Sequence, residues 1–160
     1  MPIRVTVDTS ALPTTWLTGI DRGKFEFAVI SVTSEETIGT SFVIHLAPLE
    51  EVQKHTSYGV GPYGVGPYGG TIDKDCIRRA LQIITNGAFT DPDQVVGLSP
   101  GQLRQRRDAE IICVHVGKKR DILVTSDEKG FIRDERRDRF ETEFKTLIMT
   151  PTEFVAEFRS

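Results

Sequence analysis

The stretch Arg106-Arg107-Asp108-Ala109-Glu110-Ile111-Ile112-Cys113-Val114-His115-Val116, followed by Asp121-Ile122-Leu123-Val124-Thr125-Ser126-Asp127, decides the fold. The first part has the composition of a helix that opens near one carboxylate, and the second that of a short strand that ends on another. Their close spacing predicts half of an alternating β/α unit. Asp127 then lies at the carboxyl end of a buried strand, the edge at which open α/β sheets bind ligands. A turn-capping role before Gly130 is the alternative interpretation of Asp127.

A second β-rich run ends on a carboxylate in the same way. A strand is predicted over Ile3 to Val7, and Asp8 follows it directly. Phe25 to Val32 is the longest β-type run, and its dense apolar residues predict a parallel strand covered on both faces. Because parallel strands share one carboxyl edge, we expect Asp8 and Asp127 to project into one cleft, with Asp108 on the adjoining helix.

Capping signals locate two helices. Asp73 is the expected N-cap of a helix that Asn86-Gly87 closes. Its apolar positions follow one stripe, made of Cys76, Ile77, Ala80, Leu81 and Ile84. Ser99-Pro100-Gly101-Gln102 has the capping-box pattern with proline at the first helical position, which predicts a helix to about Val116. Asp108 lies within this helix, on its exposed or cleft-facing side.

The other predicted elements alternate in type. They are a loosely helical segment from Leu12 to Ile20 interrupted at Pro13, a short helix capped by Ser34 with Glu35 and Glu36, strands at Phe42 to Leu46 and Leu147 to Met149, and a C-terminal helix opened by the capping box Thr150-Pro151-Thr152-Glu153. The alternation predicts a three-layer α/β/α fold with a mostly parallel central sheet. The length suits a single domain over residues 1–160.

The composition is that of an ordinary soluble globular protein, with 38% hydrophobic and 27% charged residues. No apolar run approaches the roughly 20 residues that span a bilayer, and the N-terminus lacks a secretory pattern, so we expect a cytoplasmic protein with no membrane contact. The net charge of −3 argues against coating nucleic acid with the whole surface. Between Arg104 and Arg139, however, eleven Lys and Arg oppose eight Asp and Glu. This excess fits a phosphate-bearing ligand, and equally a solvated surface of mixed charge.

Cys76 and Cys113 both fall inside predicted amphipathic helices, where a free thiol behaves as a small hydrophobic side chain. We therefore expect no disulfide, and their separation offers no zinc signature. His45, His55 and His115 have no metal-ligand spacing with one another, so each is expected to be structural.

Residues 57–70 contain a direct repeat of Tyr-Gly-Val-Gly-Pro, which predicts a Gly/Tyr/Pro-rich loop at about residues 56–71. Two copies of five residues are too few for a repeat architecture. The glycines are not followed by Gly-Lys-Ser/Thr, which argues against a phosphate-binding loop. Two interpretations remain open: tyrosines that stack on bases, or a tolerated loop expansion.

Four segments, in this order, resemble the PIN-domain family. They are Asp8-Thr9-Ser10 after the first strand, Arg107-Asp108-Ala109 opening into an apolar helix, Leu123-Val124-Thr125-Ser126-Asp127 with Phe131 shortly after, and the closing Ile148 to Phe154. The resemblance is strongest from Arg104 to Phe158 and weakest from Gly39 to Gly70. Members of this family are typically metal-dependent ribonucleases, and many are the toxins of toxin-antitoxin pairs.

The resemblance implies a catalytic site with Mg²⁺ or Mn²⁺ as cofactor. Its metal-binding acids are Asp8, Asp108 and Asp127, and Ser10 and Thr125 supply supporting hydroxyl groups. Hydrolysis of a phosphodiester needs a nucleophilic hydroxide at neutral pH and relief of charge on the phosphate, and a cation held by carboxylates supplies both. Without the cation the clustered carboxylates repel one another, which should raise their pKa values.

The family usually adds a fourth acid after the second strand. Glu36 is the matching residue and Glu35 the alternate, while Glu128 could accept a hydrogen bond from a metal-bound water. RNA is the implied substrate, and an antitoxin partner and a homodimer are left open. The basic residues expected to contact phosphates are Arg104, Arg107, Lys129 and Arg133.

Two other classes of protein are compatible with parts of the sequence. A phosphatase of the haloacid-dehalogenase type also begins with a strand ending in aspartate, but it needs a second aspartate where this chain has Ser10. A catalytically inactive PIN-like module that binds RNA or protein is the stronger alternative, because the loop region departs from the family pattern. Metal binding by Asp8, Asp108 and Asp127 would distinguish an active nuclease from such a module.

Overall fold

Five parallel strands form one sheet in the order β3-β2-β1-β4-β5. They are β1 (Ile3–Val7), β2 (Phe25–Ile30), β3 (Glu50–Val52), β4 (Ile122–Val124) and β5 (Leu147–Met149). The computed structural model describes residues 1–30, 50–52, 73–94 and 96–159. The strand order reverses at β1, because β2 and β3 continue on one side of it and β4 and β5 on the other.

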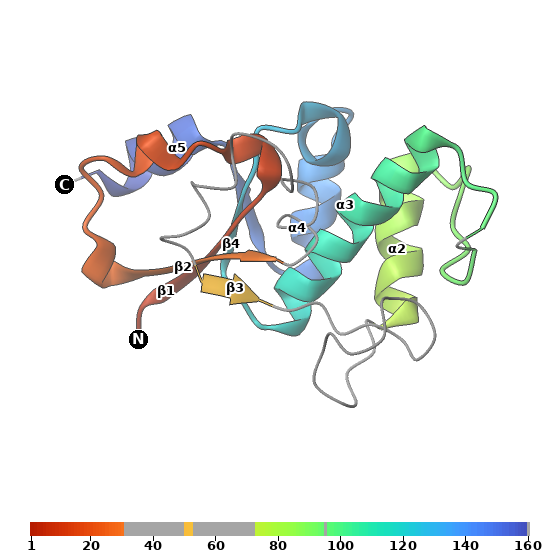
Figure 1. The fold of residues 1–160 in the computed structure, drawn as a ribbon, viewed down its shortest axis with the longest axis horizontal. Helices are drawn as coiled ribbons and strands as arrows, with labels where there is room; N and C mark the ends of the chain where they lie inside the picture. The colour runs from red at the N-terminus through yellow and green to blue at the C-terminus, as the bar shows by residue number, and fades with distance from the viewer. Residues whose placement is uncertain (31–49, 53–72, 95, 160) are drawn as a thin grey trace.

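Helices pack on both faces of the sheet in the described part of the chain (Figure 1). The α-helices are α2 (Lys74–Thr85), α3 (Pro100–Gly117), α4 (Arg136–Phe144) and α5 (Pro151–Phe158). Shorter turns are η1 (Thr9–Ala11), η2 (Thr14–Leu17), η3 (Arg22–Lys24) and a π-helical turn, η5 (Glu128–Ile132). In Figure 1, α5 lies on one side of the sheet and α2, α3 and α4 lie on the other.

Alternate residues of β2 enter two different hydrophobic clusters. Ala28 and Ile30 of β2 join the cluster formed with α2, α3 and α4. Phe25 and Val29 of the same strand join the cluster that contains Phe154 of α5. This alternation is the two-residue period of a strand. The sheet is therefore buried on both faces, as parallel sheets require.

The predicted mixed α/β fold with a parallel sheet is confirmed, and its two covered faces are compatible with a three-layer α/β/α arrangement. The predicted strands at residues 3–7 and 147–149 are present, and β2 occupies the start of the run predicted at Phe25. The predictions at Ser34, at Phe42 to Leu46 and in the loop of residues 56–71 lie outside the described residues. Among the helices that the structure describes, none is long and apolar enough to cross a membrane.

Three predicted helix starts have the expected caps. The side chain of Asp73 accepts a hydrogen bond from the backbone of Asp75 at the start of α2. Ser99 with Gln102, and Thr150 with Glu153, form reciprocal capping boxes at α3 and α5. Such caps satisfy backbone N–H groups that the first helical turn leaves without a partner.

The prediction of two free thiols is wrong, because Cys76 of α2 and Cys113 of α3 form a disulfide with their Cα atoms 5.8 Å apart. The apolar stripe predicted for residues 76–84 is confirmed, and both cysteines are buried. The error was to treat the two helices separately. Since α2 and α3 pack against each other with their buried faces, the two sulfur atoms meet in their interface.

Two segments differ from the predicted secondary structure. Leu12 to Ile20 contains η2 in place of a longer helical segment, with Pro13 as its N-cap residue. Helix α4 was not predicted at all, because Glu135 at its N-cap has a left-handed backbone conformation and makes no side-chain cap. Phe140 and Phe144 are the buried side chains of α4, too few to give a clear helical stripe in sequence.

His115 of α3 is fully buried between two threonines on different elements. Its Nδ1 lies 2.8 Å from the hydroxyl of Thr6 in β1, and its Nε2 lies 2.6 Å from the hydroxyl of Thr146 before β5. The Thr146 hydroxyl also donates to the carbonyl of Asp121 at 3.2 Å. The threonine then accepts from His115 Nε2–H, which assigns the neutral tautomer with a proton on Nε2. The structural role predicted for His115 agrees with this closed arrangement.

Candidate functional site

Asp8 and Asp127 follow the two adjacent strands at which the sheet order reverses. Register pairs Val7 of β1 with Val124 of β4, and the backbone N–H of Asp8 extends this ladder by donating to the Val124 carbonyl at 2.9 Å. In open α/β sheets, this reversal point at the carboxyl edge is where ligands bind. The structure therefore brings the ends of the two predicted strands to one place.

A hydrogen-bond network holds the carboxyl group of Asp8 in place. Ser10 and Thr125 each donate a hydroxyl hydrogen bond to its Oδ2, at 2.7 and 2.8 Å. The same two hydroxyl groups accept from the backbone, Ser10 from Ser126 and Thr125 from Asp127, at 2.9 and 3.0 Å. The two hydroxyl groups also lie 3.0 Å from each other, where either can donate to the other. Hydroxyl donors around the Asp8 carboxyl group suit its ionised form.

Burial opposes that ionisation. Asp8 is only 5% exposed, and loss of solvent is the main cause that raises the pKa of its carboxyl group above the ordinary value. The hydrogen bonds from Ser10 and Thr125 lower the pKa, while the negative charge of Asp127 raises it further. A cation at this edge would favour the ionised carboxylate, because opposite charge offsets desolvation.

Asp127 occupies the N-cap position of the turn η5. Its Oδ1 accepts a 2.9 Å hydrogen bond from the backbone N–H of Gly130. The turn-capping interpretation of Asp127 is thus geometrically correct for this one oxygen atom. Its other oxygen, Oδ2, also lies close to Gly130, 2.7 Å from the position that a Cβ atom on this glycine would take.

Asp108 of α3 approaches the same position. A Cβ atom placed on Gly130 would lie 2.7 Å from Oδ2 of Asp127 and 2.9 Å from Oδ2 of Asp108. Both oxygens approach the same point, so they are no farther apart than the sum of these distances. Asp108 is buried, at 8% exposure, so it does not lie on the exposed side of α3.

The oxygen atoms of Asp8, Asp108 and Asp127, with the hydroxyl groups of Ser10 and Thr125, are of the chemical type that binds a hard divalent cation. Carboxylate and hydroxyl oxygens are the ligands that Mg²⁺ and Mn²⁺ prefer, and close acidic oxygens are costly to bury without a positive charge. Nevertheless, the described part of the chain contains no group of three or more His, Cys, Asp or Glu residues arranged to hold a metal ion. Asp8, Asp108 and Asp127 are thus brought to one edge without forming a complete ligand cluster there, and their catalytic and metal-binding roles stay predictions.

The candidate fourth acids, Glu36 and Glu35, lie outside the described residues. Glu128 is exposed and forms an ion pair of 2.9 Å with Arg133. Glu110, two residues after Asp108 in α3, forms an ion pair of 3.5 Å with Arg106.

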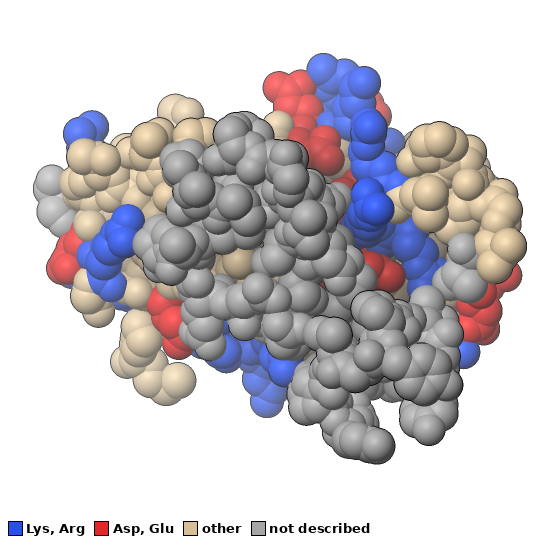
Figure 2. All heavy atoms as spheres, viewed as in Figure 1, with Lys and Arg blue, Asp and Glu red and all other residues tan. Residues whose placement is uncertain are grey.

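The predicted phosphate-contacting residues are exposed and lie on two neighbouring elements. Arg104 and Arg107 belong to α3, while Lys129 belongs to η5 and Arg133 follows it directly. Figure 2 shows Lys and Arg side chains gathered over η5 and the adjoining part of α3, with acidic side chains among them. This surface adjoins the acids because Asp108 is on α3 and Asp127 caps η5.

Three other basic residues of the Arg104–Arg139 segment lie at the opposite edge of the sheet. Lys118, Lys119 and Arg120 precede β4, so they lie at its amino end, away from Asp127. Arg120 is buried and donates to the side chain and the backbone carbonyl of Glu26, at 3.0 and 2.7 Å. The local charge excess in sequence therefore overstates the positive charge near the acids.

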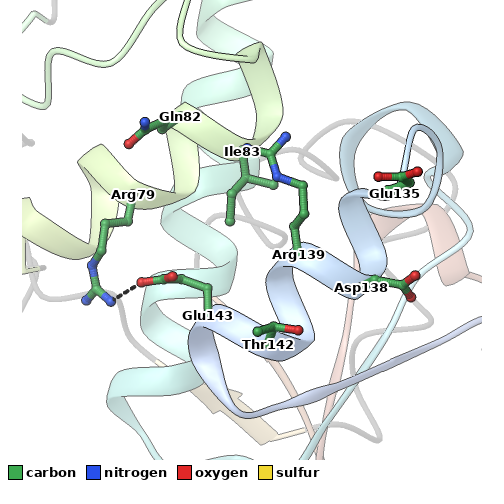
Figure 3. A pocket seen from close by; sticks show the side chains of 8 residues that line it. All are labelled: Arg79, Gln82, Ile83, Glu135, Asp138, Arg139, Thr142 and Glu143. Atoms are coloured by element: carbon green, nitrogen blue, oxygen red, sulfur yellow. Dashed lines mark hydrogen bonds and ion pairs between the residues drawn. The ribbon is translucent and has the colours of Figure 1, made fainter.

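A groove of about 570 Å³ lies elsewhere, between α2 and α4 (Figure 3). It is lined by Arg79, Gln82, Ile83, Glu135, Asp138, Arg139, Thr142 and Glu143. Arg79 crosses it to pair with Glu143 at 2.8 Å, as the dashed line in Figure 3 shows. The groove contains none of the predicted acids, so it is separate from the site at the sheet edge.

The approach of Asp108 and Asp127 to Gly130 was not predicted from the sequence, in which Gly130 only follows the turn that Asp127 could cap. The available signal was the spacing Asp127-x-x-Gly130, in which a side-chain oxygen receives the glycine N–H. The closeness of Asp108 to the same glycine depends on how α3 packs against η5. This packing cannot be predicted from a local sequence pattern.

Comparison of the chain with protein-family models, with curated proteins and with solved structures gave no match.

Proposed function

We propose that this chain is a metal-dependent ribonuclease of the PIN-domain type, which hydrolyses phosphodiester bonds of RNA. The observation that carries the proposal is the position of Asp8 and Asp127 after adjacent strands at the reversal point of the parallel sheet, with Asp108 and Asp127 both approaching Gly130. The four sequence segments that resemble the family supply these same three residues. A toxin of a toxin-antitoxin pair is the corresponding biological role, with an antitoxin protein as partner.

The proposed division of labour follows from the contacts. Asp8, Asp108 and Asp127 would hold Mg²⁺ or Mn²⁺, with Glu36 or Glu35 as a fourth acid. The bound cation would supply a hydroxide nucleophile at neutral pH and neutralise charge on the phosphate. Ser10 and Thr125 orient Asp8 through their hydroxyl groups. The exposed basic side chains of α3 and η5 would bind the RNA backbone.

Asp127→Asn tests this proposal. Asparagine keeps an oxygen that can accept from the Gly130 N–H, so the turn cap and the fold should survive, but the charge that binds a hard cation is lost. Mn²⁺ should raise the thermal midpoint of the parent protein and not that of the variant, because only the parent binds the ion in its native state. Cleavage of single-stranded RNA with Mn²⁺ should be abolished in the variant.

Asp138→Asn is the matched control, since Asp138 is an exposed aspartate in the first turn of α4. It should retain the full response to Mn²⁺. If the parent and the Asp127→Asn variant respond equally to Mn²⁺, the catalytic assignment of Asp127 is wrong and turn capping is its role.

A second candidate function is a PIN-like module that binds RNA or protein without catalysis. The observation that favours it is the lack, among the described residues, of a group of three or more potential ligands arranged around a metal. Such a module, where its ligand is RNA, should bind the RNA without cleaving it when Mn²⁺ is added. Its thermal midpoint should also be unchanged by Mn²⁺. The same melting and cleavage experiments therefore separate the two functions.

A further inference from the structure

The carboxyl groups of Asp108 and Asp127 both approach the position that a Cβ atom on Gly130 would take, and the backbone of Gly130 is fixed by its neighbour. Phe131 is fully buried, packs on Phe140 of α4 with ring centroids 5.7 Å apart, and donates its N–H to the Asp127 carbonyl at 3.1 Å. Because this anchor lies directly after Gly130, the backbone of η5 has little freedom to retreat from the carboxylates.

Space, and not backbone conformation, explains the glycine at this position. The positive-φ glycines of the described residues are Gly19, Gly87 and Gly97, and Gly130 is not among them. An L-amino acid could therefore adopt its backbone angles. Its Cβ atom, however, would lie 2.7 Å from Asp127 Oδ2 and 2.9 Å from Asp108 Oδ2, closer than carbon and oxygen atoms pack.

The atoms that such a Cβ would meet are the ends of two side chains. A carboxylate can rotate away at modest cost, whereas a backbone contact would force the elements apart. A methyl group at residue 130 should therefore leave the fold intact and turn both carboxylates away from their present positions. In doing so it would also disturb the 2.9 Å hydrogen bond from Gly130 N–H to Asp127 Oδ1.

We propose that Gly130 is a positioning residue, which lets Asp108 and Asp127 converge on one cation by having no side chain between them. This inference rests on the proposed metal-dependent function. Gly130 itself does not touch the cation or the RNA. It acts through the two carboxylates, by the space it leaves and by the N–H group that orients Asp127.

The test is the Mn²⁺ affinity of the Gly130→Ala variant, measured as free Mn²⁺ by electron paramagnetic resonance. We expect the dissociation constant to rise roughly 10- to 100-fold, the usual loss when a residue that orients metal ligands is changed. The thermal midpoint without metal should stay close to that of the parent. Gly117→Ala is the matched control, because a Cβ at Gly117 meets no atom within 4 Å, and it should bind Mn²⁺ like the parent.

A second measurement keeps the test decisive if Gly130→Ala also lowers stability. The rise in thermal midpoint that Mn²⁺ causes is measured for each protein against its own midpoint without metal, and it should be smaller for Gly130→Ala than for the parent and for Gly117→Ala. A rise equal to that of the parent, or a parent-like affinity of Gly130→Ala, overturns the positioning role. A parent protein that binds no Mn²⁺ overturns the proposed function and this inference with it.

Discussion

Thr125 donates a hydrogen bond of 2.8 Å to Oδ2 of Asp8 and so joins the end of β4 to the end of β1. Its hydroxyl also accepts from the backbone N–H of Asp127 at 3.0 Å. One buried hydroxyl group thus links two of the proposed ligands, through an oxygen of the first and the backbone of the second. Loss of this hydroxyl group should change both the stability of the protein and the pKa of Asp8.

Thr125→Val keeps the shape of the side chain and removes the hydroxyl. We expect the free energy of unfolding to fall by roughly 1–3 kcal/mol, since a buried bond to a charged group is lost and the Asp127 N–H loses its acceptor. The pKa of Asp8, already raised by burial, should rise further, because the Thr125 hydrogen bond lowers it. Urea unfolding and carboxyl-carbon nuclear magnetic resonance measure the two effects.

Thr142→Val provides the comparison, as Thr142 is exposed on α4. It should change neither the free energy of unfolding nor the pKa of Asp8 appreciably. An unchanged Asp8 pKa in Thr125→Val would show that the hydroxyl contributes nothing to the carboxylate.

The basic surface predicts a salt-dependent affinity for RNA. Replacing Arg107 and Lys129 together with alanine should weaken binding of single-stranded RNA and reduce the slope of log affinity against log salt by about 1.4, if each contacts one phosphate. Fluorescence anisotropy at several salt concentrations measures this slope.

The charge-matched control is Lys118→Ala with Lys119→Ala, at the opposite edge of the sheet. That pair should leave the slope almost unchanged. If the parent and both double variants have equal slopes, the assignment of phosphate contacts to Arg107 of α3 and Lys129 of η5 is wrong.

His115 should make the protein less stable in mild acid. Burial, together with the nearby positive charge of Arg120, lowers the pKa of His115 from 6.5 to about 3. The unfolded chain then binds a proton that the native state excludes, so stability is full above pH 6.5 and falls as the pH drops towards 3. Between pH 7 and pH 5 the loss should be about 2 kcal/mol.

His115→Gln lacks the titrating group and isolates this effect. Its unfolding free energy should be lower than that of the parent at pH 7, because the contacts with Thr6 and Thr146 are disturbed, but it should change less between pH 7 and pH 5. Identical pH dependence in the two proteins would contradict a neutral buried His115.

Local patterns in the sequence located the elements that carry their own signals. The capping boxes at Ser99 and Thr150 each satisfy N–H groups within four residues, so they can be read without knowledge of the fold. The buried β2 was equally clear from its dense apolar residues. Helix α4 gave no such signal, because only Phe140 and Phe144 of it are buried.

The site could be predicted only in part, for a similar reason. Strand ends identified Asp8 and Asp127, and parallel pairing made their proximity an expected consequence. The convergence of Asp108 on Gly130, like the meeting of Cys76 with Cys113, depends on how helices distant in sequence pack. Periodicity gives the buried face of a helix but not which residue of another helix lies opposite.

The disulfide between Cys76 and Cys113 leads to the last prediction. It joins α2 to α3 across a sequence separation of 37 residues. In the chain-entropy treatment, a cross-link of this span stabilises the native state by about 4 kcal/mol, because it restricts the unfolded chain. Reduction, or the double change Cys76→Ala and Cys113→Ala, should therefore lower the thermal midpoint by roughly 10 °C for a chain of this length.

Thiol titration in denaturant, before and after reduction, establishes the starting state. The untreated protein should show no reactive thiol and the reduced protein two, since the described residues contain no free cysteine. The reductant should have no effect on the midpoint of the double alanine variant, which separates loss of the cross-link from any other action of the reagent. Two thiols in the untreated protein, or a midpoint unchanged by reduction, would mean that the packing of α2 on α3 suffices to hold the two helices together.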